Sequence, residues 1–206
     1  MNASSISRTL AIVALVAVTP SAARAAETYT IDPTHTSVLF SCSHTNLSYT
    51  YGIFRKAQGA YVIDQQNPAN CRFRLTVDAN SLDTNHTERD NHLKSADFFS
   101  VREFPTITFE STSCVPANSE QGVVYNVTGN LTLHGVTRQV TIPVQLLGAG
   151  KGVQGDQRSG IYCHFELKRS DYGMNNLLHI VGDAVGITTS FEGVLQTAAG
   201  AQAAAR

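Results

Sequence analysis

Four cysteines are the most reactive side chains in this 206-residue sequence, and their spacing limits the chemistry available to them. None of Cys42, Cys71, Cys114 and Cys163 belongs to a Cys-x-x-Cys motif, which argues against a thioredoxin-like redox centre and against a zinc knuckle. An even number of cysteines in an exported chain favours disulfides. Four cysteines allow three pairings, and Cys42 and Cys163 are equally well interpreted as small core hydrophobes.

A second cluster combines two histidines, two carboxylates and an arginine: His86, Glu88, Arg89, Asp90 and His92. These residue types could bind a metal or perform acid–base catalysis. On a helix, however, only Glu88 and His92 share a face, and His86 precedes the expected start of the helix. The spacing therefore favours a solvated helix face with Leu93 packed inward, and no metal site is predicted.

Other polar residues offer little catalytic chemistry. His35 and His44 lie nine residues apart without a second clustered pair, and no nucleophile elbow or phosphate loop occurs in the sequence. Arg169 and Asp171 are expected to form an ion pair or a turn contact that seats the following segment, with contact to a ligand headgroup as the less favoured interpretation. We therefore predict neither a catalytic residue nor a cofactor.

The composition excludes two further classes of protein. Apolar residues make up 42% of the chain, which is too many for an intrinsically disordered protein. Fifteen basic and sixteen acidic residues give a net charge of −1, whereas a nucleic-acid-binding protein needs a basic surface that displaces counterions from phosphates. No nucleic-acid partner is predicted.

The N-terminus has the organisation of a secretory signal peptide. Arg8 precedes the apolar run 10–18, and Ala23-Arg24-Ala25 fits the recognition pattern of signal peptidase. A membrane-spanning helix needs about 20 apolar residues, and no later run approaches that length. We predict a cleaved signal peptide at 1–25, an exported domain at 26–197 without stable membrane insertion, and a flexible tail at 198–206.

The exported part is dominated by alternating apolar and polar residues, the pattern of strands with one buried face. Eight segments show it: 37–43, 52–64, 72–78, 106–110, 126–133, 139–145, 161–168 and 187–192. Helical patterning is limited to Glu88–Ser95 and Met174–Ile180. Eight antiparallel strands with one-sided apolar faces must close into a barrel or a sandwich, so the fold class is all-β with one or two short helices.

Turn residues agree with this division of the chain. Asn67-Pro68 separates two strands, and His134-Gly135 is typical of a tight hairpin between two others. Gly59 and Gly129 fall on the inner faces among large apolar residues. These small residues are consistent with the taper of a filled barrel and equally with an open tunnel.

Five motifs give the chain a specific resemblance, in this order: Ile31–Phe40 (IDPTHTSVLF), Leu82–Thr84 with Glu88–Phe99 (ERDNHLKSADFF), Phe104–Phe109 (FPTITF), Gly129–Arg138 (GNLTLHGVTR) and Arg169–Met174 (RSDYGM). The sequence resembles the YceI-like family over about residues 29–194. The resemblance implies a periplasmic or secreted protein, an eight-stranded antiparallel lipocalin-like barrel, and an apolar tunnel for a polyisoprenoid or similar long-chain amphiphile. The four cysteines depart from the family signature.

With a tunnel implied, the inward residues become the expected ligand-binding set; without one, they would fill a solid core. The set is Val38, Phe40, Cys42, Phe54, Tyr61, Phe73, Leu75, Val77, Phe98, Phe99, Ile107, Phe109, Val127, Leu131, Leu133, Val140, Ile142, Ile161, Cys163, Phe165, Leu167, Ile187 and Phe191. The function expected is an exported carrier or sequestering protein. The alternatives are a periplasmic redox or stress interaction module that uses the cysteines, and a lipid-modifying enzyme that uses His35 or Arg169. Association of two copies of the chain into a homodimer is a further open alternative.

One cysteine pairing follows from strand order. Cys71 opens one predicted strand and Cys114 closes the next, so antiparallel pairing would bring the two together. Alternation places Cys71 inward but Cys114 outward, so a bulge or turn between Glu110 and Cys114 must re-aim one of them. We predict a Cys71–Cys114 disulfide on that condition.

Overall fold

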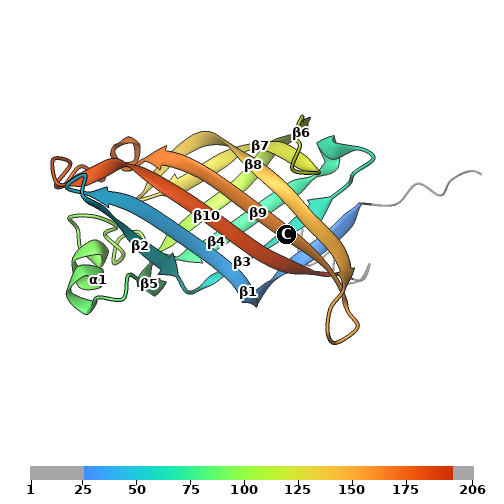
Figure 1. The fold of residues 1–206 in the computed structure, drawn as a ribbon, viewed down its shortest axis with the longest axis horizontal. Coiled ribbons are helices and arrows are strands. Elements are labelled where there is room, and N and C mark those ends of the chain that lie inside the picture. The colour runs from blue at the N-terminus through green and yellow to red at the C-terminus, as the bar shows by residue number, and fades with distance from the viewer. Residues whose placement is uncertain (1–25, 197–206) are drawn as a thin grey trace, which may run out of the picture.

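The computed structural model describes residues 26–196, which form a barrel of β-strands with one helix at its end (Figure 1). The strands are β1 (Glu27–His44), β2 (Ser48–Phe54), β3 (Ala57–Ile63), β4 (Arg72–Asp78), β5 (Leu82–Asp83), β6 (Thr106–Ala117), β7 (Val124–Leu133), β8 (Val136–Lys151), β9 (Gln157–Lys168) and β10 (Val181–Leu195), and the helix is α1 (Thr87–Lys94). The predicted signal peptide and tail lie outside the described residues.

All strands belong to one antiparallel sheet with the order β10-β9-β8-β7-β6-β4-β3-β1-β2-β5, and pairing of β10 with β1 closes it. The long strand β1 pairs with β3 through its first residues and with β2 through its last, so β2 and β3 occupy one position of the barrel. In the same way β5 extends the position of β4. The predicted eight-stranded closed barrel is therefore confirmed.

The predicted strand at 52–64 is wrong as a single element, because β2 ends at Phe54 and β3 begins at Ala57. At this break the Arg55 amide donates to the Ser81 carbonyl, and the Asp78 amide donates to the Lys56 carbonyl. The backbone leaves the regular ladder here and pairs with the 3-10 turn between β4 and β5. The break between β2 and β3 therefore lies beside the 3-10 turn between β4 and β5, and the two neighbouring positions of the barrel are interrupted at the same level.

Helix α1 begins close to its predicted position, after His86, whose Nδ1 accepts a hydrogen bond from the Arg89 amide. At 174–180, the second stretch with helical patterning, no helix forms. A 3-10 turn at Arg169–Tyr172 ends at Gly173, where φ is +79°, and the following residues form turns. The carbonyls of Met174 and Asn176 accept hydrogen bonds from the Arg169 side chain, so they are engaged outside any helical ladder.

Two predicted turns are confirmed. A 3-10 turn at Pro68–Asn70 separates β3 from β4. His134 and Gly135 both have positive φ and connect Leu133 to Val136 as a two-residue hairpin between β7 and β8. None of the helices in residues 26–196 is long and apolar enough to cross a membrane.

Candidate functional site

An apolar cavity of about 180 Å³ lies inside the barrel. Of the predicted ligand-binding residues, these line it: Val38, Phe40, Cys42, Phe54, Tyr61, Phe73, Leu75, Val77, Phe98, Phe99, Ile107, Phe109, Leu131, Leu133, Ile142, Ile161, Cys163, Phe165, Leu167, Ile187 and Phe191. Strand alternation brings the strand residues together because every second side chain of each strand points to the axis, and Phe98 and Phe99 are added from the turn after α1. Their contact with a ligand stays a prediction.

Two predicted residues are placed elsewhere. Val127 is fully buried in a core cluster and, like its cluster neighbours Tyr125 and Cys114, does not line the cavity. Val140 packs between two core clusters and is also absent from the cavity wall. Alternation assigned both to the correct face of their strands, but a barrel interior has filled layers as well as an open one.

Other lining residues escaped the sequence prediction. Ile31 points inward although it is an odd-numbered residue on the strand of Val38, because β1 has an irregular register between Ile31 and Thr36 that changes the phase of alternation. Pro33 was the available signal for this irregularity. Met174 reaches the cavity from the turns before β10, and Val181 reaches it from the first position of β10, outside the predicted strand.

The interior is hollow and not a filled core. Leu75, Phe165 and Ile187 point into the barrel, line the cavity and are still only partly buried. In a close-packed interior such side chains would be sealed by their neighbours. The choice between a tunnel and a solid core, which periodicity left open, is thereby decided in favour of an internal cavity.

The small residues expected to create this space do not do so. A Cβ atom on Gly129 would lie 2.6 Å from Cζ of Phe109, so the Phe109 ring already occupies the position above Gly129. A Cβ atom on Gly59 would meet the carbonyl oxygen of Arg74 at 2.1 Å. Both glycines permit close packing, and the space comes from the wide spacing of the larger side chains around them.

One end of the cavity is closed by tyrosines. Tyr61 donates a hydrogen bond from its hydroxyl to the Ser159 carbonyl at 2.8 Å, and its ring stacks on Tyr29 at 5.1 Å between centroids. A Cβ atom on Gly193 would lie 2.4 Å from the Tyr61 hydroxyl oxygen, so only glycine leaves room for the phenol there. Burial raises the pKa of Tyr61 to about 12.

The other end is covered by α1 and the segments around it, at the left of Figure 1. Leu93 of α1 packs inward as predicted, and the Phe99 ring contacts Phe40 and Phe54 edge-on or tilted. Leu93 and Phe99 both line the cavity and are only partly buried. This cover is formed by side chains from a short helix and a turn, and not by paired strands.

Arg169 holds the second half of this cover in place. Its guanidinium donates to four backbone carbonyls, those of Met174, Asn176, Val181 and Gly182, at 2.6–2.9 Å. It also lies 5.8 Å from the centre of the Phe98 ring. The expected turn contact that seats the following segment is confirmed. Burial lowers the pKa of Arg169, and the four carbonyl dipoles keep the cation in place.

The charged cluster at α1 is internally paired. Asp90 accepts hydrogen bonds from the amide and hydroxyl of Thr84, and Arg89 donates to the hydroxyl and carbonyl of Thr84. His92 Nε2 lies 3.0 Å from an oxygen of Asp97. Among the described residues, no group of three histidine, cysteine, aspartate or glutamate side chains is arranged to hold a metal ion. The cluster fastens α1 to the loop before it.

His35 belongs to an ion-pair network away from the cavity. Its Nδ1 lies 2.8 Å from Asp32, which also accepts from Arg158 at 2.6 Å, and Arg158 contacts Glu192 at 2.9 Å. The hydrogen bonds from His35, Arg158 and Thr34 hold the pKa of Asp32 well below its usual range. The network joins β1, β9 and β10 where β1 loses its regular register.

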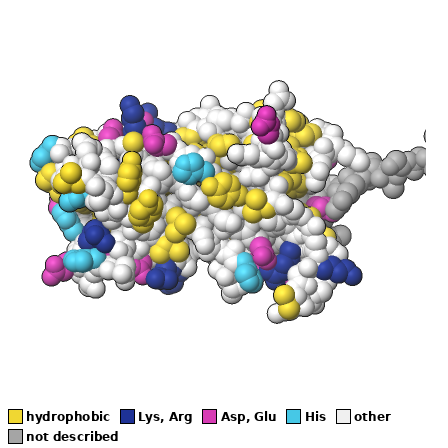
Figure 2. Space-filling model, in the orientation of Figure 1, with side chains coloured by type: hydrophobic (Ala, Val, Ile, Leu, Met, Phe, Trp, Pro, Cys, Tyr) yellow, Lys and Arg dark blue, Asp and Glu magenta, His cyan; other side chains and the backbone are white. Residues whose placement is uncertain are grey.

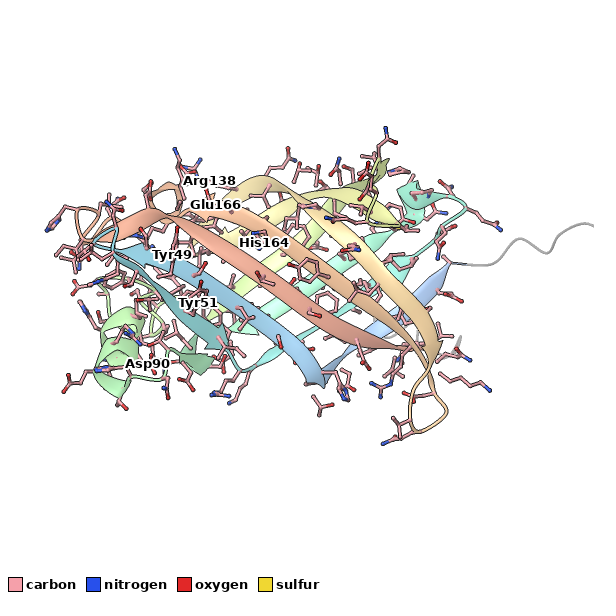
Figure 3. The ribbon with its side chains drawn as sticks, in the orientation of Figure 1. Tyr49, Tyr51, Asp90, Arg138, His164 and Glu166 are labelled. Carbon is pink, nitrogen blue, oxygen red and sulfur yellow. The ribbon has the colours of Figure 1, made fainter. Side chains whose placement is uncertain are left out.

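The outer face of the barrel carries a mixed population of side chains (Figure 2). Tyr49 and Tyr51 of β2 are exposed, and their rings lie 6.5 Å apart (Figure 3). His164 and Glu166 are exposed on β9, at positions that alternate with the cavity-lining Cys163, Phe165 and Leu167. Outward and inward positions are thus separated by strand alternation alone.

All four cysteines are buried and present as thiols. Cys42 and Cys163 line the cavity, where Cys42 donates to the Gly182 carbonyl at 3.0 Å and burial raises the pKa of Cys163 to about 11. The Cys71 and Cys114 thiols influence each other electrostatically, and neither residue lines the cavity. The interaction with Cys114 lowers the pKa of Cys71, and the same interaction together with burial raises the pKa of Cys114.

The sequence and fold were compared with known proteins. Residues 29–193 match the YceI-like domain family. A UPF0312 protein of Pseudomonas paraeruginosa is 40% identical over 192 residues, which cover 92% of this chain and 98% of that protein. Protein YceI of Salmonella newport is 38% identical over 162 residues, which cover 79% of this chain and 83% of that protein.

Solved structures give the same barrel. Burkholderia cenocepacia BcnA superposes with a TM-score of 0.71 and 25% identity, covering 79% of this chain and 98% of BcnA. A polyisoprenoid-binding domain from Saccharophagus degradans, implicated in plant cell wall breakdown, superposes with a TM-score of 0.61 and 16% identity. That likeness covers 82% of this chain and 98% of that domain, and it is a likeness of fold.

Proposed function

The chain belongs to the YceI-like family, and from this membership and its internal cavity we propose that it is an exported carrier or sequestering protein for a polyisoprenoid or similar long-chain amphiphile. The observation that carries the proposal is the wall of the cavity, which is almost entirely aliphatic and aromatic. Burial of apolar surface is favourable by about 25 cal/mol per Å², so such a wall favours a hydrocarbon chain over a polar ligand.

A fold neighbour supports the proposed ligand class. The fold neighbour from Saccharophagus degradans is described as a polyisoprenoid-binding domain, and its barrel superposes over most of this chain. The cavity of this chain is elongated along the strands, since it extends from Phe98 near α1 to Phe191 beside Tyr61. A linear chain fits that shape better than a compact ring system.

We place the entrance at the α1 end. The opposite end is blocked by the hydrogen-bonded Tyr61 and by the buried layer of Tyr29, Tyr125 and Val127 beyond it. At the α1 end, the partly buried side chains of Leu93 and Phe99 cover the cavity without strand pairing. Local opening costs least where few buried contacts and few ladder hydrogen bonds must break.

The volume of the cavity adds a requirement. Pockets for drug-sized ligands measure roughly 300–1,000 Å³, and this cavity of about 180 Å³ is smaller. A long chain must therefore displace the Phe98–Phe99 segment or protrude past it. We expect ligand binding to move that segment and to leave the Tyr61 end in place.

Catalysis is not part of this proposal, because the candidate catalytic groups are committed to other contacts. Arg169 is buried and donates to four backbone carbonyls, and His35 pairs with Asp32 away from the cavity wall. Arg169 itself lines the cavity, and the other polar residues of the wall are Arg74, which donates to Glu110, Thr189, and two cysteines whose pKa values are raised by burial. These groups suit binding of an apolar chain.

Native mass spectrometry tests the proposal. The full chain with its own N-terminus is expressed in a bacterial host, purified from the periplasm without detergent, and analysed intact and after solvent extraction. We expect the processed protein to carry an adduct that fragments into isoprene units. The stripped protein should then take up a polyprenol more tightly than a straight-chain alkanol of equal length. Preference for the alkanol, or no uptake of either probe, would contradict the proposed ligand class.

A further inference from the structure

We infer that Cys71 and Cys114 form a disulfide that fastens the closed end of the barrel when the chain folds in an oxidising compartment. The strands already place the two residues face to face. Arg74 pairs with Glu110, and the β6–β7 register shifts by one residue between Ser111 and Ser113. With one extra residue in β6, the continued β4–β6 register sets Cys71 opposite Cys114.

This shift is the bulge that the pairing required. Without it, Cys71 would oppose Ser113 and Cys114 would point outward. The bulge is held by Ser111, which is buried and accepts a hydrogen bond at its hydroxyl from the Phe73 amide at 2.8 Å. Cys71 and Cys114 are then 0% and 3% exposed. A directly opposed antiparallel pair has the separation that a disulfide needs.

The remaining two cysteines cannot pair with each other. On β10, Cys42 pairs with Val185 and Cys163 pairs with Thr189, four residues further along. That offset is about 13 Å along a strand, which is beyond the reach of a disulfide. Both line the cavity, whereas Cys71 and Cys114 do not. One disulfide and two free thiols follow.

The chemistry is a thiol–disulfide exchange with an external disulfide, either of a protein oxidant or of a small molecule. One thiolate attacks the external disulfide and forms a mixed disulfide, and the second thiolate displaces the external thiol. Cys71 and Cys114 together lose two protons and two electrons, and the external disulfide is reduced to two thiols. Because both sulfurs are buried in the folded barrel, the exchange takes place before the barrel closes.

The bond would join the start of β4 to the end of β6 and enclose β5 and α1 between them. It would therefore fix the end of the barrel away from α1 while the α1 end stays uncrosslinked. This inference goes beyond the proposed carrier function, since a barrel with two more thiols could still bind a chain. Loss of the bond and loss of ligand uptake are separate results.

Tryptic mapping reads the pairing directly, because each cysteine lies on a different peptide. Cys71 lies on peptide 57–72, Cys114 on 103–138, Cys163 on 159–168, and Cys42 on the peptide that ends at Arg55. The protein is refolded in glutathione redox buffer, alkylated and digested without reduction. We expect peptide 57–72 linked to 103–138, with Cys42 and Cys163 alkylated. Four alkylated cysteines, or Cys71 linked to another partner, would overturn the inference.

Thermal unfolding supplies a second readout. Wild type refolded with glutathione should melt about 5–15 °C higher than wild type refolded with reductant. Cys71→Ala and Cys114→Ala should abolish that difference, while the matched variants Cys42→Ala and Cys163→Ala should keep it. A redox-dependent shift that persists in Cys71→Ala would refute the assignment, even if every variant melts lower than wild type.

Discussion

Tyr61 of β3 and Ser159 of β9 are joined across the barrel interior by the hydrogen bond from the Tyr61 hydroxyl to the Ser159 carbonyl, although β1 and β10 separate their strands in the sheet. Gly193, which pairs with Ser159 on the neighbouring strand, provides the room for the phenol. The bond ends the cavity on one side. The Tyr61 side chain therefore closes this end of the cavity and limits its length along the barrel axis.

This arrangement predicts alkaline sensitivity. The pKa of Tyr61 is raised to about 12 in the folded protein, whereas tyrosine in an unfolded chain has a pKa of about 10. The neutral hydroxyl therefore stabilises the folded state fully below pH 10, and this contribution is lost as the pH rises from 10 to 12. The contribution is at most about 2–3 kcal/mol. Between pH 10 and 12, the free energy of unfolding of Tyr61→Phe should fall less steeply than that of wild type. Urea titrations at several pH values measure this.

The control is Tyr51→Phe, because Tyr51 is 69% exposed and has no part in closing the cavity. Its unfolding free energy should follow wild type across the same pH range. Identical alkaline slopes for all three proteins would show that Tyr61 ionises equally easily in the folded and unfolded chain.

A second prediction concerns Gly193. The Cβ atom of Gly193→Ala would lie 2.4 Å from the Tyr61 hydroxyl oxygen, so Tyr61 must shift and lose its bond to Ser159. Overpacking of this kind destabilises by about 1–3 kcal/mol. Gly150→Ala is the matched variant, since no atom lies within 4 Å of a Cβ there, and it should stay within about 0.5 kcal/mol of wild type. Equal denaturation midpoints for the two variants would contradict the close contact.

Much of this fold could be predicted from alternation because side-chain direction in a strand is a local property. Val38, Phe40 and Cys42 point inward whatever strand lies beside them. The same pattern could not distinguish a filled layer from an open one. Val127 and Phe165 alternate identically, but Val127 is fully buried and Phe165 lines the cavity, because the difference depends on residues from other strands.

The failures share a physical cause, which is contact between residues distant in sequence. The space above Gly129 is filled by Phe109 from the neighbouring strand, so the small residue is no evidence of a gap. The expected helix at 174–180 is replaced by turns whose carbonyls bind Arg169. The bulge in β6, by contrast, could be predicted. Alternation placed Cys71 on the inner face and Cys114 on the outer face, so the two cysteines could meet only if β6 contained an extra residue.

A third prediction tests the cavity as the binding site. Ile187 points into the cavity and is partly buried, whereas Thr188 lies next to it on the outer face. Ile187→Trp should fill part of the cavity and lower polyprenol affinity at least tenfold, which is about 1.4 kcal/mol. Thr188→Trp should bind like wild type. Isothermal titration calorimetry suits this comparison, because the wild-type chain has no tryptophan whose fluorescence could be followed. Unchanged affinity in Ile187→Trp would place the ligand elsewhere.

The last prediction concerns the cover at the α1 end, where Arg169 connects two carbonyls of the turn before β10 with those of the first two residues of β10. A lysine carries the same charge, but its ammonium is a compact group on a flexible stem and cannot reproduce the planar fork of a guanidinium. Arg169→Lys should therefore leave buried carbonyls without donors and destabilise the protein by about 2–4 kcal/mol. The loss should be concentrated in the cover, so hydrogen exchange should accelerate in residues 174–182 more than in β3 and β9.

Arg138→Lys is the matched control, since Arg138 is exposed and donates through Nε to the carbonyl of Asp171, and its exchange pattern should equal that of wild type. If the cover also gates the entrance, polyprenol should enter and leave Arg169→Lys faster while the equilibrium affinity changes less. Uniform acceleration of exchange across all strands would instead mean that Arg169 stabilises the whole barrel and does not act on the cover.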